Sequence, residues 1–219
     1  MGRIYDATWG RAFSAVYDRG FKATEEAGLS DMRHELLAQA RGRVLELGAG
    51  TGLNLEHYPE AIEGLTLVEP DPHMTKQLRE KLAQMGEDST VLVVEAPAEQ
   101  LPFPDESFDT VVVTLVLCTV PDQAAALSEI KRILKPDGKL LFLEHVRSRN
   151  PDLAKWQDRL ERPWRFLGDG CHCNRDTVSA ISTAGFTLDD VESGELPKLP
   201  PIVRPLSRGR ATNPRPRSS

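Results

Sequence analysis

Hydrophobic residues in the central part of the chain form short apolar runs that alternate with amphipathic segments. Five of these runs predict β-strands: VLEL at 44–47, LTLVE at 65–69, TVLVVE at 90–95, FDTVVVTLVLC at 108–118 and KLLFLEHV at 139–146. Segments 72–85 and 121–134 instead place apolar residues every three or four positions, which predicts helices. Asp71 and Pro72 favour a helix start there.

This alternation predicts an α/β fold, a Rossmann-like doubly wound and mostly parallel sheet of about seven strands. A helix ending at Gly185 and a further strand, FTLDDVE at 186–192, extend the pattern. Right-handed crossovers bring the carboxyl ends of the strands to one edge, where such folds bind their ligands. Residues 147–174 have no strand period, and we expect them to form a cap inserted after the fifth strand, above that edge.

The predicted α/β domain spans residues 31–193, and the two ends of the chain differ from it in composition. In residues 1–30, an aromatic residue recurs every fourth position, at Tyr5, Trp9, Phe13, Tyr17 and Phe21, so these side chains share one helix stripe. We expect a lid helix over the active site. The alternatives are a helix packed on the core, or a helix on a membrane surface with Arg3, Arg11 and Arg19 along it. Residues 194–219 are rich in proline and arginine, which favours a partly disordered tail.

Charge and cysteine content narrow the class of protein. A hydrophobic share of 40% and a charged share of 27% are those of an ordinary globular chain. The net charge of −6 argues against a nucleic-acid partner. Three cysteines, no signal peptide and no long apolar run predict a cytoplasmic protein without stable membrane insertion. The sequence does not indicate an oligomeric state.

A glycine-rich loop, GAGTG, follows the first strand. A dinucleotide-binding loop would have its third glycine one position later, where this chain has Leu53. Glu46, two residues before Gly48, would repel a pyrophosphate but not a cationic ligand. Glu69 ends the second strand, where a carboxylate in α/β folds accepts hydrogen bonds from ribose hydroxyls. A ligand with a ribose and positive charge fits S-adenosylmethionine.

These motifs, with AEQLPF and the FD before the fourth strand, resemble the class I S-adenosylmethionine-dependent methyltransferases over residues 44–146. The resemblance implies that Gly48, Ala49 and Gly50 lie against the methionine part, that Glu69 binds the ribose and that Ala98 and Glu99 border the adenine. Many members carry an acid where this chain has Pro97. The candidate cofactor-binding residues are Glu46, Gly48, Ala49, Gly50, Gly52, Asn54, Glu69, Pro70, Pro97, Ala98, Glu99 and Leu115.

A narrower resemblance runs from about Glu35 to Glu192. The stretches LVEPDPHM, EAPAEQL, TLVLCTV, LEHV, RPWRFLGDGC and NRDT are similar to the small-molecule thiol S-methyltransferases of the methyltransferase-like family, with a methyltransferase type 11 core. The resemblance implies methyl transfer to a small-molecule thiol. The mammalian members begin with a hydrophobic anchor that this sequence lacks. The alternatives are a quinone or other small-molecule C-, O- or N-methyltransferase, a non-catalytic S-adenosylmethionine-binding module and a nucleotide-dependent oxidoreductase.

The stretch FLGDGCHC at 166–173 holds two of the three cysteines. A single C-x-C is too few ligands for a zinc site and does not match the C-x-x-C of redox pairs, so we expect no metal. Asp169, Cys171 and nearby Trp164 are instead predicted to shape the acceptor pocket. The alternative is that Cys171 and Cys173 are small buried apolar residues. His145, at the end of the fifth strand, and Asp169 are the candidate bases that would deprotonate a thiol. The alternative for His145 is a structural histidine.

Overall fold

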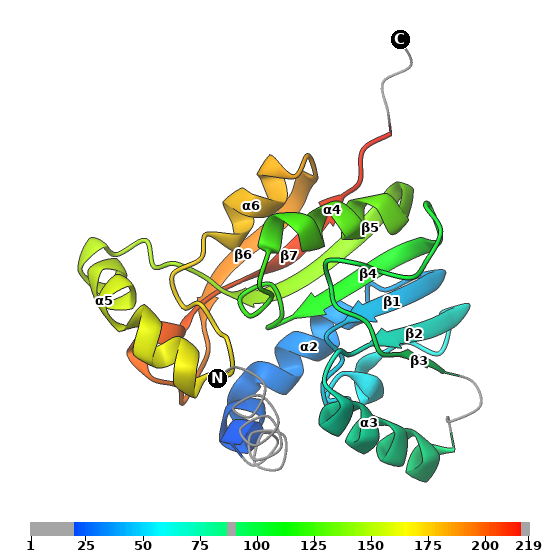
Figure 1. Ribbon diagram of the computed structural model, residues 1–219, viewed down its shortest axis with the longest axis horizontal. Helices are drawn as coiled ribbons and strands as arrows, with labels where there is room; N and C mark the ends of the chain where they lie inside the picture. Colours follow the sequence, from blue (N-terminus) through cyan, green and yellow to red (C-terminus); the bar gives the residue numbers. More distant parts are fainter. Residues whose placement is uncertain (1–19, 87–90, 216–219) are drawn as a thin grey trace.

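The computed structural model describes residues 20–86 and 91–215, which form a seven-stranded sheet covered by helices on both faces (Figure 1). The strand order is β3-β2-β1-β4-β5-β7-β6. Neighbours from β3 to β5 pair in parallel, and only β7 runs antiparallel to both of its neighbours. The strands are β1 (Arg43–Leu47), β2 (Gly64–Val68), β3 (Leu92–Val94), β4 (Phe108–Thr114), β5 (Leu134–His145), β6 (Thr187–Glu195) and β7 (Pro205–Thr212). The predicted fold class is confirmed.

Two hydrophobic cores lie on the two faces of the sheet. One packs α4 (Gln123–Ile133) and α6 (Thr177–Thr183) against the strands, and the other packs α2 (Ser30–Leu37) and α3 (Pro72–Met85). The helix α3 begins at Pro72 as the sequence predicts, whereas α4 begins at Gln123, two residues later than predicted. The Asp71 and Asp122 carboxylates each accept two backbone N–H bonds of the first turn. Because helices cover both faces of the sheet, a ligand has access to the sheet at the edge formed by the carboxyl ends of the strands.

The fourth strand is shorter than its apolar run predicts. It ends at Thr114, because Leu115 adopts a left-handed conformation with φ of 60°. The next residues, Val116 to Cys118, form a turn at the carboxyl edge of the sheet and are still buried. Hydrophobicity alone does not distinguish a buried strand from the buried turn that follows it.

The predicted cap contains a helix, α5 (Pro151–Leu167), which lies beyond the carboxyl ends of the strands (Figure 1). Asn150 caps its first turn. Gln157, fully buried, anchors the helix: its amide oxygen accepts from the backbone N–H of Ser148 at 2.7 Å, and its amide nitrogen donates to the carbonyls of Cys173 and Ile202 at 2.8 and 2.9 Å. The helix is therefore hydrogen-bonded to cap residues before and after it and to the segment before β7.

The expectation of a partly disordered tail at 194–219 is wrong for most of its length. A short helix, η3 (Pro201–Val203), leads into β7, which inserts between β5 and β6. Arg208 pairs with Glu35 and Glu192, each at 2.7–2.8 Å. The prediction failed because prolines do not exclude a strand at every position. Pro205 is the first residue of its strand, a position that tolerates proline. Residues 216–219 lie outside the described part of the chain.

Most of the predicted lid helix, including Tyr5, Trp9, Phe13 and Tyr17, also lies outside the described residues. From Gly20 the chain is helical, passes through the π-helical segment η1 (Glu25–Leu29) and continues into α2. Gly28, with φ of 126°, kinks this stretch. Within residues 20–86 and 91–215, no helix combines the length and the apolar character needed to cross a membrane.

Candidate active site

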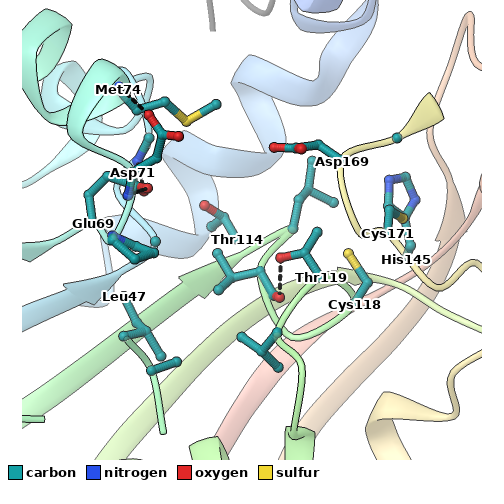
Figure 2. Close-up of a pocket in the computed structure, with 18 of the residues that line it drawn as sticks. Leu47, Glu69, Asp71, Met74, Thr114, Cys118, Thr119, His145, Asp169 and Cys171 are labelled. Atoms are coloured by element: carbon teal, nitrogen blue, oxygen red, sulfur yellow. Dashed lines mark hydrogen bonds between the residues drawn. The ribbon is translucent and has the colours of Figure 1, made fainter. Parts of the chain in front are cut away.

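A single pocket of about 500 Å³ lies at the carboxyl ends of β1, β2, β4 and β5. This volume is within the range of small-molecule sites, roughly 300–1,000 Å³. Figure 2 shows Glu69, Asp71 and Met74 on one side of the pocket and Cys118, His145, Asp169 and Cys171 on the other. The glycine loop and the loop after α5 thus border the same space, as the sequence predicts.

The glycine loop approaches its neighbours too closely for a side chain. Gly48 has φ of 67°, and a Cβ atom there would lie 2.5 Å from the Val116 side chain. The N–H groups of Gly48 and Ala49 both donate to the carbonyl of Val68, at 2.7 and 3.0 Å. These bonds fix the loop against the end of β2, next to Glu69.

Glu69 is 5% exposed, and both of its carboxylate oxygens are oriented by the backbone. Oε2 accepts from the N–H of Gly50 at 2.8 Å, and Oε1 accepts from the N–H of Asp71 at 2.9 Å. Burial raises its pKa above the ordinary value, against the effect of these two bonds. Each oxygen keeps a second acceptor site, so the carboxylate can accept two further hydrogen bonds from a ligand diol in the pocket.

Glu46 lies behind the glycine loop. It lines a separate hollow of about 20 Å³. Its carboxylate accepts from the Asn54 amide at 2.9 Å and from the Tyr58 hydroxyl at 2.7 Å, and burial raises its pKa to about 7. The buried Arg33 guanidinium donates to the Asn54 side chain at 2.8 Å. Glu46 and Asn54 thus form one buried network under the loop.

The structure divides the sequence-predicted residues into three groups. Gly52 packs its backbone near the Leu55 and Leu78 side chains and lines neither space. Ala49, Glu46 and Asn54 line only the small hollow. The main pocket is lined by Gly48, Gly50, Glu69, Pro70, Pro97, Ala98, Glu99, Leu115, His145 and Asp169.

The pocket is acidic. Glu69, Asp71, Glu99 and Asp169 line it, and over residues 20–86 and 91–215 no lysine or arginine does. A cationic ligand is therefore attracted there, whereas a pyrophosphate would be repelled.

His145 is 5% exposed at the opposite end from Glu69. Its Nδ1 atom is buried without a hydrogen-bond partner in the described part of the chain. Burial lowers its pKa to about 4, although a hydrogen bond with the Val203 backbone acts in the other direction. The imidazole is therefore neutral near pH 7, and its ring lines the pocket while its Nδ1 atom is shielded from solvent.

Comparisons with known proteins agree with this site. A family model described as "Methyltransferase domain" matches residues 45–142. Thiol S-methyltransferase TMT1B of Homo sapiens is 35% identical over 187 residues, which cover 81% of this chain and 74% of the relative. The chain belongs to the S-adenosylmethionine-dependent methyltransferase family. Thiol S-methyltransferase TMT1B of Rattus norvegicus is 40% identical over 151 residues, 68% of this chain, and the match spans 62% of that relative's length.

A solved structure supports the fold of this methyltransferase. An S-adenosylmethionine-dependent methyltransferase from Thermotoga maritima, titled a possible histamine N-methyltransferase, superposes with a TM-score of 0.65 at 24% identity. The match covers 93% of this chain and 97% of the other. At this identity the likeness shows the fold alone.

Sequence reasoning missed Glu144, which does not itself line the methyltransferase pocket but accepts hydrogen bonds from residues that do. Its fully buried carboxylate accepts from the backbone N–H groups of Val116, Leu117 and Cys118 at 2.8, 2.9 and 3.2 Å. Burial raises its pKa to about 7, although the three N–H donors favour the charged form. Glu144 holds the turn after β4 against the pocket. A charged residue inside the apolar run LLFLEHV was the available signal.

The end of α5 and the loop after it line the methyltransferase pocket. Trp164 and Leu167 belong to the helix, and Asp169 and Cys171 belong to the loop, with Asp169 in a left-handed conformation of φ 48°. A Cβ atom on Gly168 would lie 3.1 Å from the Trp164 indole nitrogen, so the loop closes tightly over the end of α5. The predicted pocket-shaping residues of this loop do line the pocket.

Proposed function

We propose that this protein transfers the methyl group of S-adenosylmethionine to a small thiol. One observation carries the proposal: one continuous pocket joins the Glu69 carboxylate and the glycine loop to an apolar end whose lining includes the neutral His145. This arrangement brings a donor and an acceptor into one space from opposite sides. Placement of this kind is the main contribution an enzyme makes to a direct displacement.

The residues at the Glu69 end fit the methyl donor. Glu69 is oriented to accept two ribose hydroxyls, and the acidic lining favours a sulfonium and an ammonium. Pro97 offers no side-chain acceptor to the adenine amino group. Glu99 already accepts from the N–H of Asp122 at 3.0 Å through one oxygen, which leaves the other for the adenine.

When bound, S-adenosylmethionine supplies a methyl group on a positively charged sulfur. The protein's own residues orient the acceptor and take its proton. A small thiol has a pKa of about 8.5, so most of it is protonated near neutral pH. In this proposal the His145 imidazole, which lines the pocket, accepts the thiol proton as the sulfur becomes nucleophilic, and Trp164 and Leu167 keep water away.

Two observations favour a thiol over other acceptors. The two TMT1B relatives are named thiol S-methyltransferases. The acceptor end is lined by Trp164, Leu167, Leu199 and two cysteines, an apolar and polarisable surface that suits a neutral sulfur compound. The cytoplasmic location and the lack of a nucleic-acid partner stay predictions from the sequence.

A methyl-transfer assay tests the proposal directly. The protein is incubated with S-adenosylmethionine and separate panels of small thiols, quinols and amines, and S-adenosylhomocysteine is followed by mass spectrometry. We expect turnover with thiols. Turnover only with quinols or amines would refute the thiol assignment and keep the methyltransferase. Binding of S-adenosylmethionine without turnover on any panel would indicate a binding module.

Substitution of His145 with alanine is expected to lower kcat/KM for a thiol of ordinary pKa by up to about 30-fold at pH 7, because roughly 3% of a thiol of pKa about 8.5 is thiolate at that pH without a base. Because the pKa of His145 is about 4, the parent enzyme should show no loss of activity from histidine protonation near pH 6.5. The deficit of the variant should shrink above about pH 9, where the thiol ionises without help.

An aromatic thiol that is already ionised at pH 7 is the matched control. It needs no base, so His145→Ala should slow its methylation far less than that of an aliphatic thiol. An equal loss with both thiols at every pH would show that His145 is structural and would remove it from the mechanism.

A further inference from the structure

Two cysteines from distant parts of the chain meet at the acceptor end of the pocket. Cys118 belongs to the turn after β4, and Cys171 belongs to the loop after α5. Both line the pocket, and they are 1% and 6% exposed. Figure 2 shows them on the same side of it, next to His145. Both contribute to the lining of the acceptor end, but neither thiol reacts in methyl transfer as proposed above.

The backbones that carry these cysteines are held together. The N–H of His172, the residue after Cys171, donates to the carbonyl of Cys118 at 2.8 Å, so one hydrogen bond joins the two segments next to the cysteines. A disulfide needs Cα atoms about 4.4–6.8 Å apart, and the two thiols are already within hydrogen-bond reach of each other. The Glu144 carboxylate fixes the Cys118 side of the contact through the N–H of Cys118.

The two thiols are not equivalent. A hydrogen bond with Cys171, together with burial, raises the pKa of Cys118 well above its ordinary value. The same hydrogen bond lowers the pKa of Cys171, and Trp164 and the positive charge of Arg175 lower it further. Cys171 is therefore the one that ionises first, with the Cys118 thiol beside it.

The third cysteine provides a comparison. Cys173 is fully buried and does not line the pocket. Its Sγ lies 3.7 Å from the carbonyl oxygen of Gln157, and burial raises its pKa to about 11. It has neither access to the pocket nor a tendency to ionise.

We propose that Cys118 and Cys171 form a dithiol site that reacts with small-molecule disulfides entering the acceptor end of the pocket and that closes to an intramolecular disulfide. The Cys171 thiolate attacks one sulfur of the compound RSSR, which forms a mixed disulfide and releases RS⁻. Cys118 then loses its proton to solvent and attacks Sγ of Cys171, which releases the second RS⁻. In total, RSSR and two cysteine thiols give two RSH and one Cys118–Cys171 disulfide, so the protein is oxidised and the compound is reduced.

The consequence for function rests on the proposed thiol acceptor. A small disulfide is the oxidised form of such an acceptor and fits the same apolar space. Its reaction covalently changes two walls of that space, so we expect the oxidised form of the acceptor to stop methyl transfer until the Cys118–Cys171 bond is reduced.

The test uses the full chain, reduced, desalted and incubated with bis(2-hydroxyethyl) disulfide. Trypsin leaves Cys171 and Cys173 in one peptide, because no lysine or arginine separates them. The Cys173→Ser variant is therefore used to assign the bond. We expect the loss of two hydrogen atoms in the intact mass and a cross-link between the Cys118 and Cys171 peptides, formed as fast in Cys173→Ser as in the parent.

Single variants separate the two steps. Cys118→Ser should stop at a mixed disulfide, with one 2-hydroxyethylthio group on Cys171. Cys171→Ser should react at least about 10-fold more slowly, since the more ionised thiol is gone. Unreacted thiols in the parent, a stable mixed disulfide in the parent, or a bond that includes Cys173 would overturn the proposal.

The two proposals fail in distinguishable ways. If the reduced protein methylates thiols but forms no cross-link, the dithiol proposal is wrong and the proposed function stands. If the cross-link forms but the reduced protein methylates no thiol, the acceptor assignment is wrong and the dithiol site stands.

Discussion

Substitution of Glu69 with alanine is expected to weaken S-adenosylmethionine binding by on the order of 100-fold, measured by isothermal titration calorimetry. Each hydrogen bond to a buried carboxylate contributes roughly 1.5–3 kcal/mol, and the variant loses two to the ribose. Glu69 also orients the N–H groups of Gly50 and Asp71, which would be left without their acceptor. The loss should therefore be among the largest of any single pocket substitution.

A ligand control separates the ribose contact from the effect on the glycine loop. The 2′,3′-dideoxy form of S-adenosylhomocysteine cannot donate to Glu69, so Glu69→Ala should change its affinity much less than that of S-adenosylhomocysteine itself. Equal losses for the two ligands would show that Glu69 acts only by shaping the loop. Unchanged affinity for both would refute the ribose assignment.

Substitution of Glu144 with alanine is expected to lower the free energy of unfolding by roughly 3–5 kcal/mol, because three backbone N–H groups would be left buried without an acceptor. The unfolding free energy of a typical domain is about 5–15 kcal/mol, so the effect is large. Urea denaturation followed by circular dichroism measures it. Glu144→Gln should lower the free energy of unfolding less than Glu144→Ala does. The glutamine oxygen can still accept two of the three hydrogen bonds, although its NH₂ group faces the third N–H donor.

An exposed glutamate on the same sheet is the matched control. Glu192 pairs with Arg208 at the surface. Glu192→Ala should lower the free energy of unfolding by no more than about 1 kcal/mol, as is usual when an exposed ion pair is removed. A Glu144→Ala variant as stable as Glu192→Ala would show that the turn after β4 does not need the carboxylate.

Local features were predictable because their physical causes are local. The glycine loop and the carboxylate at the end of β2 have fixed places relative to one strand and its loop, and Asp71 caps the helix that begins next to it. The alternation of apolar and amphipathic segments was sufficient to predict the doubly wound sheet. From these elements, the position of Glu69 at the carboxyl edge followed without knowledge of the packing.

Other features depended on contacts between segments far apart in the sequence. Residues 205–212 were predicted to be part of a tail, since prolines and arginines recur through residues 194–219. Their place between β5 and β6 instead gives their backbone two partner strands and gives Arg208 two carboxylates. Glu46 was predicted to bind the ligand because it lies two residues before the first glycine of the loop. In the structure its carboxylate instead accepts hydrogen bonds from Tyr58 and Asn54.

The sequence by itself determined the sheet, the cofactor loop and the chemical class of the ligand, because spacing along one strand, loop or helix decides these. Only the tertiary structure decided that Glu144 binds the turn after β4, and that Cys118 meets Cys171 across one backbone hydrogen bond. Such contacts arise when distant segments pack on the same edge of the sheet, and a periodicity within either segment carries no information about its partner.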